Sequence, residues 1–260
     1  MLDMIQLNWQ PVAAVIGLSA FWLWEGFAPL IPARNRYRHA AVNLAVTMLN
    51  WLLLLALAAV TLAVAEAAAA REIGVLHLIS LPSPFYFCGA LLLYDMWSYW
   101  WHRISHRIPF LWRFHRMHHS DPAMDVSTAT RFHPGEIFLS SMIRLLVIPL
   151  IGMPAAALVV YDGVQLANTQ FHHANISIFG WLDRAVRFIL VSPDMHKVHH
   201  SPLRVEADSN YSSVLSVWDR IFGSYRELSA DREVRFGLDE FQKPETQSFG
   251  GLLRTPLSPR

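Results

Sequence analysis

The chain has 260 residues, enough for one sizeable domain or two small ones, and 53% of them are apolar. Charged residues make up 16%, against roughly 25% in a typical soluble domain, and the mean hydropathy is +0.28. The formal net charge of +1 gives no broad attraction to nucleic acid. The single cysteine, Cys88, excludes an intrachain disulfide and a cysteine-ligated metal site. These values favour a membrane protein.

Four stretches have a length and composition suited to a bilayer. The first ten residues contain one acid and no Lys or Arg, so they lack the basic start of a secretory signal, and we expect the first apolar segment to be retained as a span. The four stretches are residues 11–33, 40–69, 84–101 and 137–170. The last is too long for one span, each half is short for a full crossing, and it is interrupted by Pro149, Gly152 and Pro154. It is expected to form a helical hairpin or re-entrant pair.

Arginines near the ends of the spans predict the orientation, because basic residues favour the cytoplasmic side. The second loop carries only Arg71, whereas the first loop and the region after the third span carry Arg34, Arg36, Arg38, Arg103, Arg107, Arg113 and Arg116. This alternation predicts an outside N-terminus and a cytoplasmic location for residues 102–137 and 171–260. All the clustered histidines then lie on one side of the membrane.

The C-terminal third is more polar than the rest. Residues 181–190 have helical amphipathic spacing and could lie in the plane of the interface. The segment after residue 228 is charged, then rich in Pro, Ser and Gly, and is expected to be a loose tail. We therefore predict an all-α, polytopic membrane helical bundle with a cytoplasmic helical cap that carries a metal site. Its parts are an N-terminal transmembrane region (1–83), a catalytic domain (84–228) and a peripheral tail (229–260).

Histidine is the unusual residue, with thirteen in the chain. An HxxxH pair is followed by two HxxHH triplets, and on a helix the spacings i, i+3 and i+4 place side chains on one face. The pair and triplets are His102 and His106; His115, His118 and His119; and His196, His199 and His200. His172 and His173 are adjacent, and His133 stands alone.

A lone histidine is usually a surface, capping or core residue, and an isolated HxxxH pair could be coincidence. Two triplets and a pair within one short region are better explained as metal ligands, because burying so many imidazoles without partners is costly. A single metal takes four to six ligands, so nine or ten imidazoles suit two ions. Imidazole accepts Zn, Cu, Fe and Ni, and the spacing alone does not select among them. The ligands are too many for an ordinary zinc hydrolase and lack the glutamates of soluble di-iron bundles.

At these motifs the sequence resembles the fatty acid hydroxylase and sterol desaturase superfamily, which consists of integral membrane, non-haem di-iron oxygenases. The resemblance covers roughly residues 85–226 and rests on five segments: HRISH (102–106), FHRMHHS (114–120), HHANI (172–176), SPDMHKVHHS (192–201) and NYSSVLSVWDRIFGSY (210–225). The extra histidine of the family aligns with His173, which makes His172 a weaker candidate ligand. Ser212 stands where the family commonly has Gly, in a position that looks like a turn.

The resemblance implies two iron ions, O2 as oxidant and hydroxylation, or alternatively desaturation, of a lipid such as a sterol-like, fatty acyl, carotenoid or ether lipid. No fused cytochrome b5 domain is expected, so the resemblance also implies an external electron donor: a cytochrome b5-like protein, a ferredoxin or a reductase. The enzyme would be integral to a bacterial-type inner or plasma membrane, with its active site facing the cytoplasm.

Several polar residues near the motifs are candidates to support the ligands, because metal-bound histidines usually donate their second N–H to a carboxylate or carbonyl. Asp95 could do so or could pair with Arg103, while Asp194 and Asn175 are further candidates. Asp219 and Arg220 are expected to be structural, as a mutual or helix-end pair, and Glu25 is expected to face a cation or an interface.

Two alternatives to an enzyme are a non-catalytic membrane metal-binding or transport protein and an inactive family member. A transporter needs polar residues along a continuous path, and the first two spans offer little beyond Glu25 and Asn43. The intact motifs argue against an inactive protein.

Overall fold

The computed structural model describes residues 9–32, 35–227 and 234–259. Within these residues the secondary structure is helical, and the one β-type contact is an isolated bridge between Leu190 and Leu215. The all-α prediction is therefore confirmed for the described chain. The predictions for residues 1–8 and for Arg34 lie outside the described residues.

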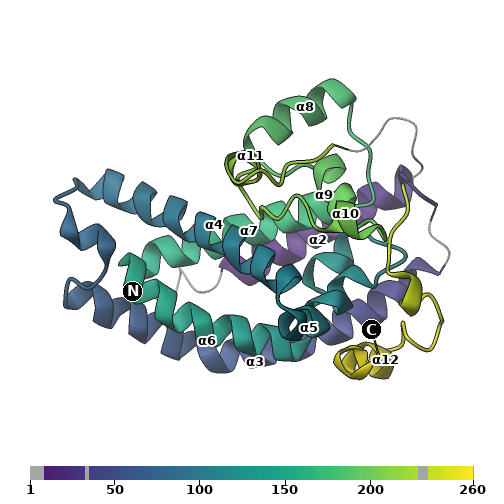
Figure 1. The fold of residues 1–260 in the computed structure, drawn as a ribbon, viewed down its shortest axis with the longest axis horizontal. Helices are drawn as coiled ribbons and strands as arrows, with labels where there is room; N and C mark the ends of the chain where they lie inside the picture. Colours follow the sequence, from purple (N-terminus) through teal and green to yellow (C-terminus); the bar gives the residue numbers. More distant parts are fainter. Residues whose placement is uncertain (1–8, 33–34, 228–233, 260) are drawn as a thin grey trace.

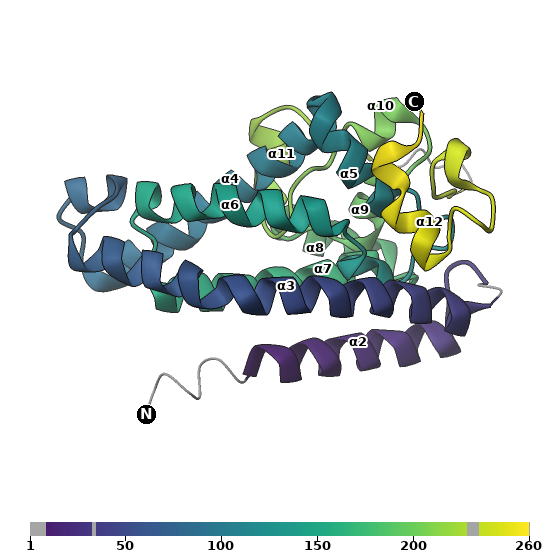
Figure 2. The ribbon, with the colours of Figure 1, turned by 90° about the horizontal axis from the view of Figure 1, so that it is seen from below.

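Five long helices run side by side along the long axis of the molecule (Figures 1 and 2). They are α2 (Trp9–Phe27), α3 (Arg36–Ala70), α4 (Ser83–Arg107), α6 (Pro134–Ile151) and α7 (Ala155–His173). The loop between α3 and α4 lies at one end of the molecule, and the short elements gather toward the opposite end. They are α5 (Pro109–His119), η2 (Val126–Thr130), α8 (Gly180–Ile189), α9 (Pro193–His199), α10 (Arg204–Ala207) and α11 (Val217–Ile221).

The stretch 137–170 forms the expected helical hairpin, with α6 and α7 joined at Gly152, which adopts a left-handed φ of 82°. This turn packs against the loop between α3 and α4, where a Cβ added to Gly74 would lie 2.2 Å from the Gly152 nitrogen. Tyr86 donates a hydrogen bond to the Gly152 carbonyl over 2.6 Å. The hairpin thus reaches as far as the α3–α4 loop. The expectation of a half that is short for a crossing is wrong for α6, which is long and apolar enough to cross a membrane.

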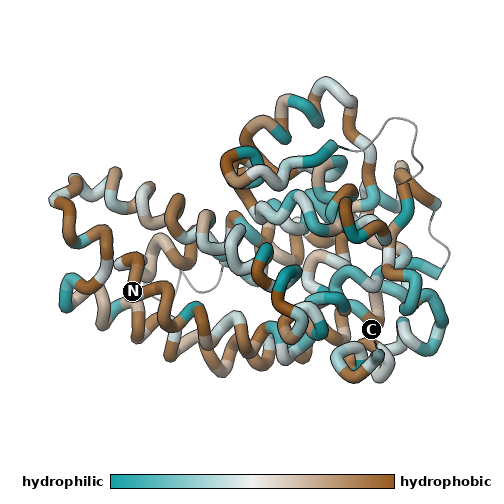
Figure 3. Tube along the Cα trace, in the orientation of Figure 1, coloured by the Kyte–Doolittle hydropathy of each residue, from teal (hydrophilic) through white to brown (hydrophobic). Residues whose placement is uncertain are grey.

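Among the described residues, two segments are long and apolar enough to cross a membrane, Arg36–Leu78 and Pro134–Ile151, so the full set of four expected spans is not confirmed. In the most apolar 18-residue stretch of each segment, only 17% and 22% of the residues are buried inside the protein. Their apolar side chains therefore face outward, as lipid-facing helices require. Figure 3 shows hydrophobic colouring along much of α3 and α6.

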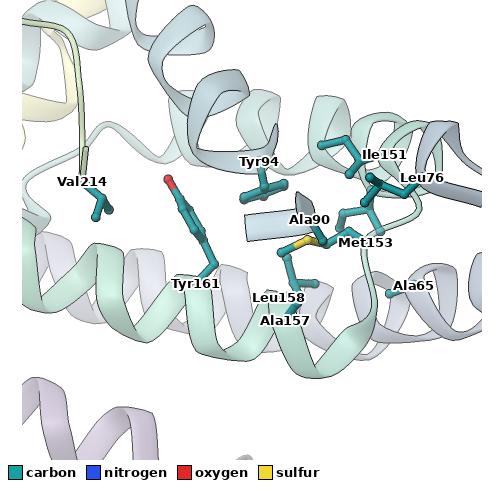
Figure 4. Close-up of a cluster of buried hydrophobic side chains, with 11 residues drawn as sticks. Ala65, Leu76, Ala90, Tyr94, Ile151, Met153, Ala157, Leu158, Tyr161 and Val214 are labelled. Carbon is teal, nitrogen blue, oxygen red and sulfur yellow. The ribbon is translucent and has the colours of Figure 1, made fainter. Parts of the chain in front are cut away.

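The larger apolar core of the described residues lies between α3, α4, α6 and α7 (Figure 4). Tyr94 and Tyr161 meet edge to face in this core, with ring centroids 4.9 Å apart. Leu158 and Met153 fill the space toward the hairpin turn. This packing fixes α4 against α7 and thereby sets the positions of the histidines at their C-terminal ends.

The expectation of a loose C-terminal tail is wrong for residues 234–259. The segment contains η3 (Asp239–Phe241), α12 (Phe249–Leu253) and η4 (Thr255–Leu257). Leu252 is fully buried against α3 and α5. The buried Arg116 of α5 donates hydrogen bonds to the carbonyls of Thr255 and Ser258, each with a donor–acceptor distance of 2.6 Å. The tail therefore packs against the helix that carries the first triplet.

Candidate metal centre

Four helices bring the predicted histidines together. His102 and His106 lie one turn apart at the C-terminal end of α4, and the first triplet occupies the last turn of α5. His173 ends α7. The second triplet lies on α9 and its C-cap, where Ser192 caps the helix by accepting a hydrogen bond from the Met195 backbone. Local helical spacing thus makes each motif a ligand set, and tertiary packing joins the sets.

The nine histidines singled out from the sequence form two groups, and within each group the candidate ligand atoms lie within 4.8 Å of one another. The first group contains His102, His106, His115, His119 and His199, and the second contains His118, His173, His196 and His200. Each group draws on three helices. We call them the five-histidine group and the four-histidine group.

Ring nitrogens point inward in both groups. The Nε2 atom of His102 lies 3.0 Å from those of both His115 and His199. In the other group the Nε2 atom of His173 lies 3.0 Å from that of His118 and 3.1 Å from that of His196. Converging nitrogens at this separation leave a space bordered by lone pairs, which is the donor set that a divalent transition metal accepts.

Burial favours the neutral form of several of these imidazoles. Desolvation, followed by the charges of neighbouring histidines, lowers the pKa of His119 and His199 well below the usual value, and the pKa of His118 is lowered in the same way. Both ring nitrogens of His106 and of His119 are buried without a hydrogen-bond partner. Unsatisfied buried nitrogens are costly, and neutral imidazole is the metal-binding form. The residues therefore fit two metal ions.

Carboxylates and backbone carbonyls orient several of the outward-facing Nδ1 atoms. Glu136 of α6 accepts a hydrogen bond from His115 at 2.6 Å. An oxygen of Asp208 lies 3.4 Å from Nδ1 of His106, close enough for a charge interaction but without a hydrogen bond. The carbonyls of Tyr211, Ser209 and Thr169 accept from His102, His199 and His173 at 2.6–2.8 Å. Sequence reasoning missed Glu136 and Asp208, because neither shares a helix face with the histidine that it contacts.

The two remaining histidines of this region lie outside both groups. His172 is buried, stacks on His196 with ring centroids 4.0 Å apart, and lies 3.3 Å from the amide of Asn168. His133 caps α6 by accepting a hydrogen bond from the backbone of Gly135. His172 thus stacks on a member of the four-histidine group without belonging to either group.

The three predicted supporting residues contact protein segments and not the grouped histidines. Asp95 accepts hydrogen bonds from Tyr161, Trp218 and the backbone of Leu215, so neither suggested role, orienting a ligand or pairing with Arg103, is seen directly. It steadies the segment whose Tyr211 carbonyl accepts from His102.

Asp194 pairs with Lys197 at 3.0 Å, and Asn175 exchanges two hydrogen bonds with the backbone of Ile31. Glu25 is buried, 3.7 Å from Arg36, and accepts from the backbones of Val126 and Asn175. These contacts make all three residues parts of the scaffold.

Asp219 has the expected structural role, although its partner is not Arg220. Its carboxylate accepts hydrogen bonds from the backbones of Tyr211 and Ser212 and from the Ser224 hydroxyl. Arg220 instead donates to Ser216 and to the Arg187 carbonyl. Asp219 thus closes the loop that begins at Asn210. Asn210 has a positive φ of 52° and lies beside the second triplet.

Comparison with known proteins finds several lipid hydroxylases and monooxygenases among the relatives of this chain. Human alkylglycerol monooxygenase is 33% identical over 171 residues, which is 62% of this chain and 35% of the relative. The ornithine lipid hydroxylase OlsE of Rhizobium tropici is 28% identical over 60% of the chain and 46% of the relative. Human cholesterol 25-hydroxylase is 25% identical over 86% of the chain and 77% of the relative.

The chain spans about a third of the length of the alkylglycerol monooxygenases that it matches. No solved structure gives a significant match. The fatty acid hydroxylase family model matches residues 87–224, which contain all nine histidines of the two groups. The chain belongs to the fatty acid hydroxylase family.

Proposed function

We propose that this chain is a membrane-bound di-iron oxygenase that uses O2 and external electrons to hydroxylate a lipid, with desaturation as the alternative outcome. The observation that carries the proposal is the convergence of nine imidazoles, eight of them buried and that of His102 partly buried, into two adjacent groups. The relatives support the reaction class, because their names describe an alkylglycerol monooxygenase, an ornithine lipid hydroxylase and a cholesterol 25-hydroxylase. These substrates differ, so the proposal stops at the class of membrane lipid.

The nine grouped histidines would hold the two ions. Once bound, iron supplies the activation of dioxygen and the oxidation of an unactivated C–H bond. The chain's own residues orient the ligands through Glu136 and the backbone carbonyls, and they keep water away by burying the imidazoles. Phe132 stacks on His118 with ring centroids 4.4 Å apart and adds apolar cover to the four-histidine group.

The membrane arrangement supports a lipid substrate. Leu146 and Leu150 of α6 are 61% and 64% exposed, on a helix apolar enough to lie in a bilayer. A dissolved lipid can therefore approach the histidines along the helices without crossing water. The arginine distribution supports a cytoplasmic position for the histidine end, and we propose residues 84–228 as the catalytic domain.

Metal analysis and product analysis test the proposal together. Purified protein loaded with iron should hold two ions per chain, and His118→Ala and His199→Ala should each lose metal and lipid oxidation. His133→Ala is the matched control, since His133 lies outside both groups. Mass spectrometry of the lipids of cells with and without the protein should show a product with one added oxygen atom, or one lacking two hydrogens if desaturation occurs. Full activity of metal-free protein would overturn the proposal.

A further inference from the structure

A cavity of about 180 Å³ lies where α4 ends and α5 begins. Its lining includes His106, Arg107, Trp112, Arg116, Arg204 and Glu240. The Arg204 side chain is 64% exposed, so the cavity lies at the surface, yet its wall contains a member of the five-histidine group. The cavity therefore connects the outside of the protein with a candidate metal ligand.

Trp112 fills the short distance between this cavity and the histidines. Its ring centroid lies 4.9 Å from that of His106 and 5.4 Å from that of His119. On the outer side, the guanidinium carbon of Arg204 lies 5.6 Å from the ring centroid. One partly buried aromatic ring thus contacts two members of the five-histidine group and also a cation exposed to solvent.

The charge around the cavity is mainly positive. Arg107 and Arg204 are exposed and Arg116 is buried, while Glu240 is the one acid in the lining. Asp208 pairs with Arg204 at 3.1 Å, and Arg204 also donates to the His106 carbonyl over 3.3 Å. These contacts hold the Arg204 guanidinium over the tryptophan. Cations still outnumber anions, so the surface suits an acidic partner.

The proposed function requires electrons from outside the chain, and the present inference rests on that function. Hydroxylation consumes a C–H bond, O2, two protons and two electrons, and yields a C–OH group and one water. The sole cysteine, Cys88, cannot form an intrachain dithiol that would supply a pair of electrons. Two molecules of a one-electron carrier must therefore each be oxidised once per turnover, and the two electrons end in the water.

We propose that this cavity is the docking site of an acidic one-electron carrier protein, and that Trp112 is the residue through which electrons reach the five-histidine group. Arg107 and Arg204 attract and orient the carrier. Electron transfer slows steeply with distance. The aromatic ring of Trp112, which contacts His106 and His119, divides the distance between the carrier and the histidines into shorter steps.

The cavity is a poor site for the lipid. A substrate oxidised by both ions has to reach the space between the two groups, whereas this cavity is lined by a member of the five-histidine group and by none of the four-histidine group. Its guanidinium groups and Glu240 also contrast with the apolar wall that an acyl chain needs. The positions of these residues favour a carrier over a substrate.

Stopped-flow reduction of iron-loaded protein in phosphatidylcholine nanodiscs tests the inference, with a reduced, acidic plant-type [2Fe–2S] ferredoxin as the probe. Arg204→Glu and Arg107→Glu should each lower the bimolecular reduction rate about tenfold at low salt and flatten its salt dependence. Reduction by photoreduced lumiflavin, which has no fixed charge, should not change. Trp112→Leu should slow reduction at saturating ferredoxin without altering ferredoxin affinity, and Trp112→Phe should recover part of the rate.

Arg71→Glu is the matched control. Arg71 is exposed at the C-terminal end of α3, next to the α3–α4 loop, and this loop lies at the opposite end of α4 from the cavity. It should leave every rate unchanged. The affinity of oxidised ferredoxin for metal-free protein gives a second readout, which Arg204→Glu should weaken. Unchanged affinity and rate in both arginine variants, or equal losses with ferredoxin and lumiflavin, would overturn the inference. Wild-type protein that holds no metal would overturn the proposed function instead, and the affinity measurement would still decide the docking site.

Discussion

His115 donates a hydrogen bond from Nδ1 to an oxygen of Glu136 over 2.6 Å. The two residues lie on different helices, α5 and α6, and the carboxylate can only accept. This bond fixes the tautomer of His115 so that the lone pair of Nε2 faces the five-histidine group. It also places a negative charge behind an imidazole that is proposed to bind a cation, which raises the basicity of that ligand.

Glu136→Ala should weaken metal binding at the five-histidine group by about 10–100-fold, the usual cost of losing such a partner. Glu136→Gln should cost less, because the amide oxygen can still accept the hydrogen bond although the charge is lost. Competitive metal titration measures both, with Glu66→Gln as the control, since Glu66 is exposed on α3. Equal affinity in wild type and Glu136→Ala would show that the contact has no such role.

The adjacent histidines of α7 should differ in metal binding. His173→Ala should reduce the metal content from two ions to about one, because His173 belongs to the four-histidine group. His172→Ala should keep both ions, because its side chain contacts Asn168 and the ring of His196 and belongs to neither group. Metal analysis of the two purified variants checks this, and a lost ion in His172→Ala alone would reverse the assignment.

Removing the Asp219 carboxylate should destabilise the loop beside the second triplet. In Asp219→Asn one oxygen becomes an N–H group that faces buried donors, at a cost of about 1–3 kcal/mol. Thermal unfolding in detergent should show a lower midpoint. The exposed Asp239, paired with Arg235 at the surface, provides the control Asp239→Asn, for which we expect no measurable shift. A variant as stable as wild type would contradict the assigned hydrogen bonds.

The buried ion pair between Arg131 and Asp121 should be costly to break. Their closest charged atoms lie 3.4 Å apart, and Arg131 also donates to Ser120 and, over 2.7 Å, to Gln247 in the C-terminal tail. Arg131→Met should cost about 3–5 kcal/mol, because Asp121 loses a buried partner.

Hydrogen exchange should also speed up around Gln247 in this variant, since the tail loses an anchor. Arg235→Met, which alters an arginine that is 63% exposed, should have neither effect. A variant that is as stable as wild type but whose tail exchanges faster would mean that Arg131 anchors the tail and that its ion pair with Asp121 adds no stability.

Much of the candidate centre follows from local sequence. The spacing i, i+3, i+4 puts the first triplet on one helix face whatever surrounds it. The apolar content of residues 40–69 is likewise a local property, and it predicts the long helix that is observed. The hairpin between α6 and α7 was predictable from Pro149 and Gly152, which interrupt the pattern. The packed tail was not, because Arg116 meets the Thr255 carbonyl across 139 residues and no local pattern signals such a contact.

The sequence by itself determined that the chain is helical, which histidines would share a face, and that they are too numerous for one metal. Tertiary structure decided how they divide into two groups: His118 joins His173, while His119, one residue later, joins His102. It also decided that Glu136 and not Asp95 contacts a grouped histidine. Helical periodicity sets direction within one element, whereas contacts between elements depend on how α4, α5, α6 and α7 pack, and this packing uses apolar surfaces from segments far apart in the chain.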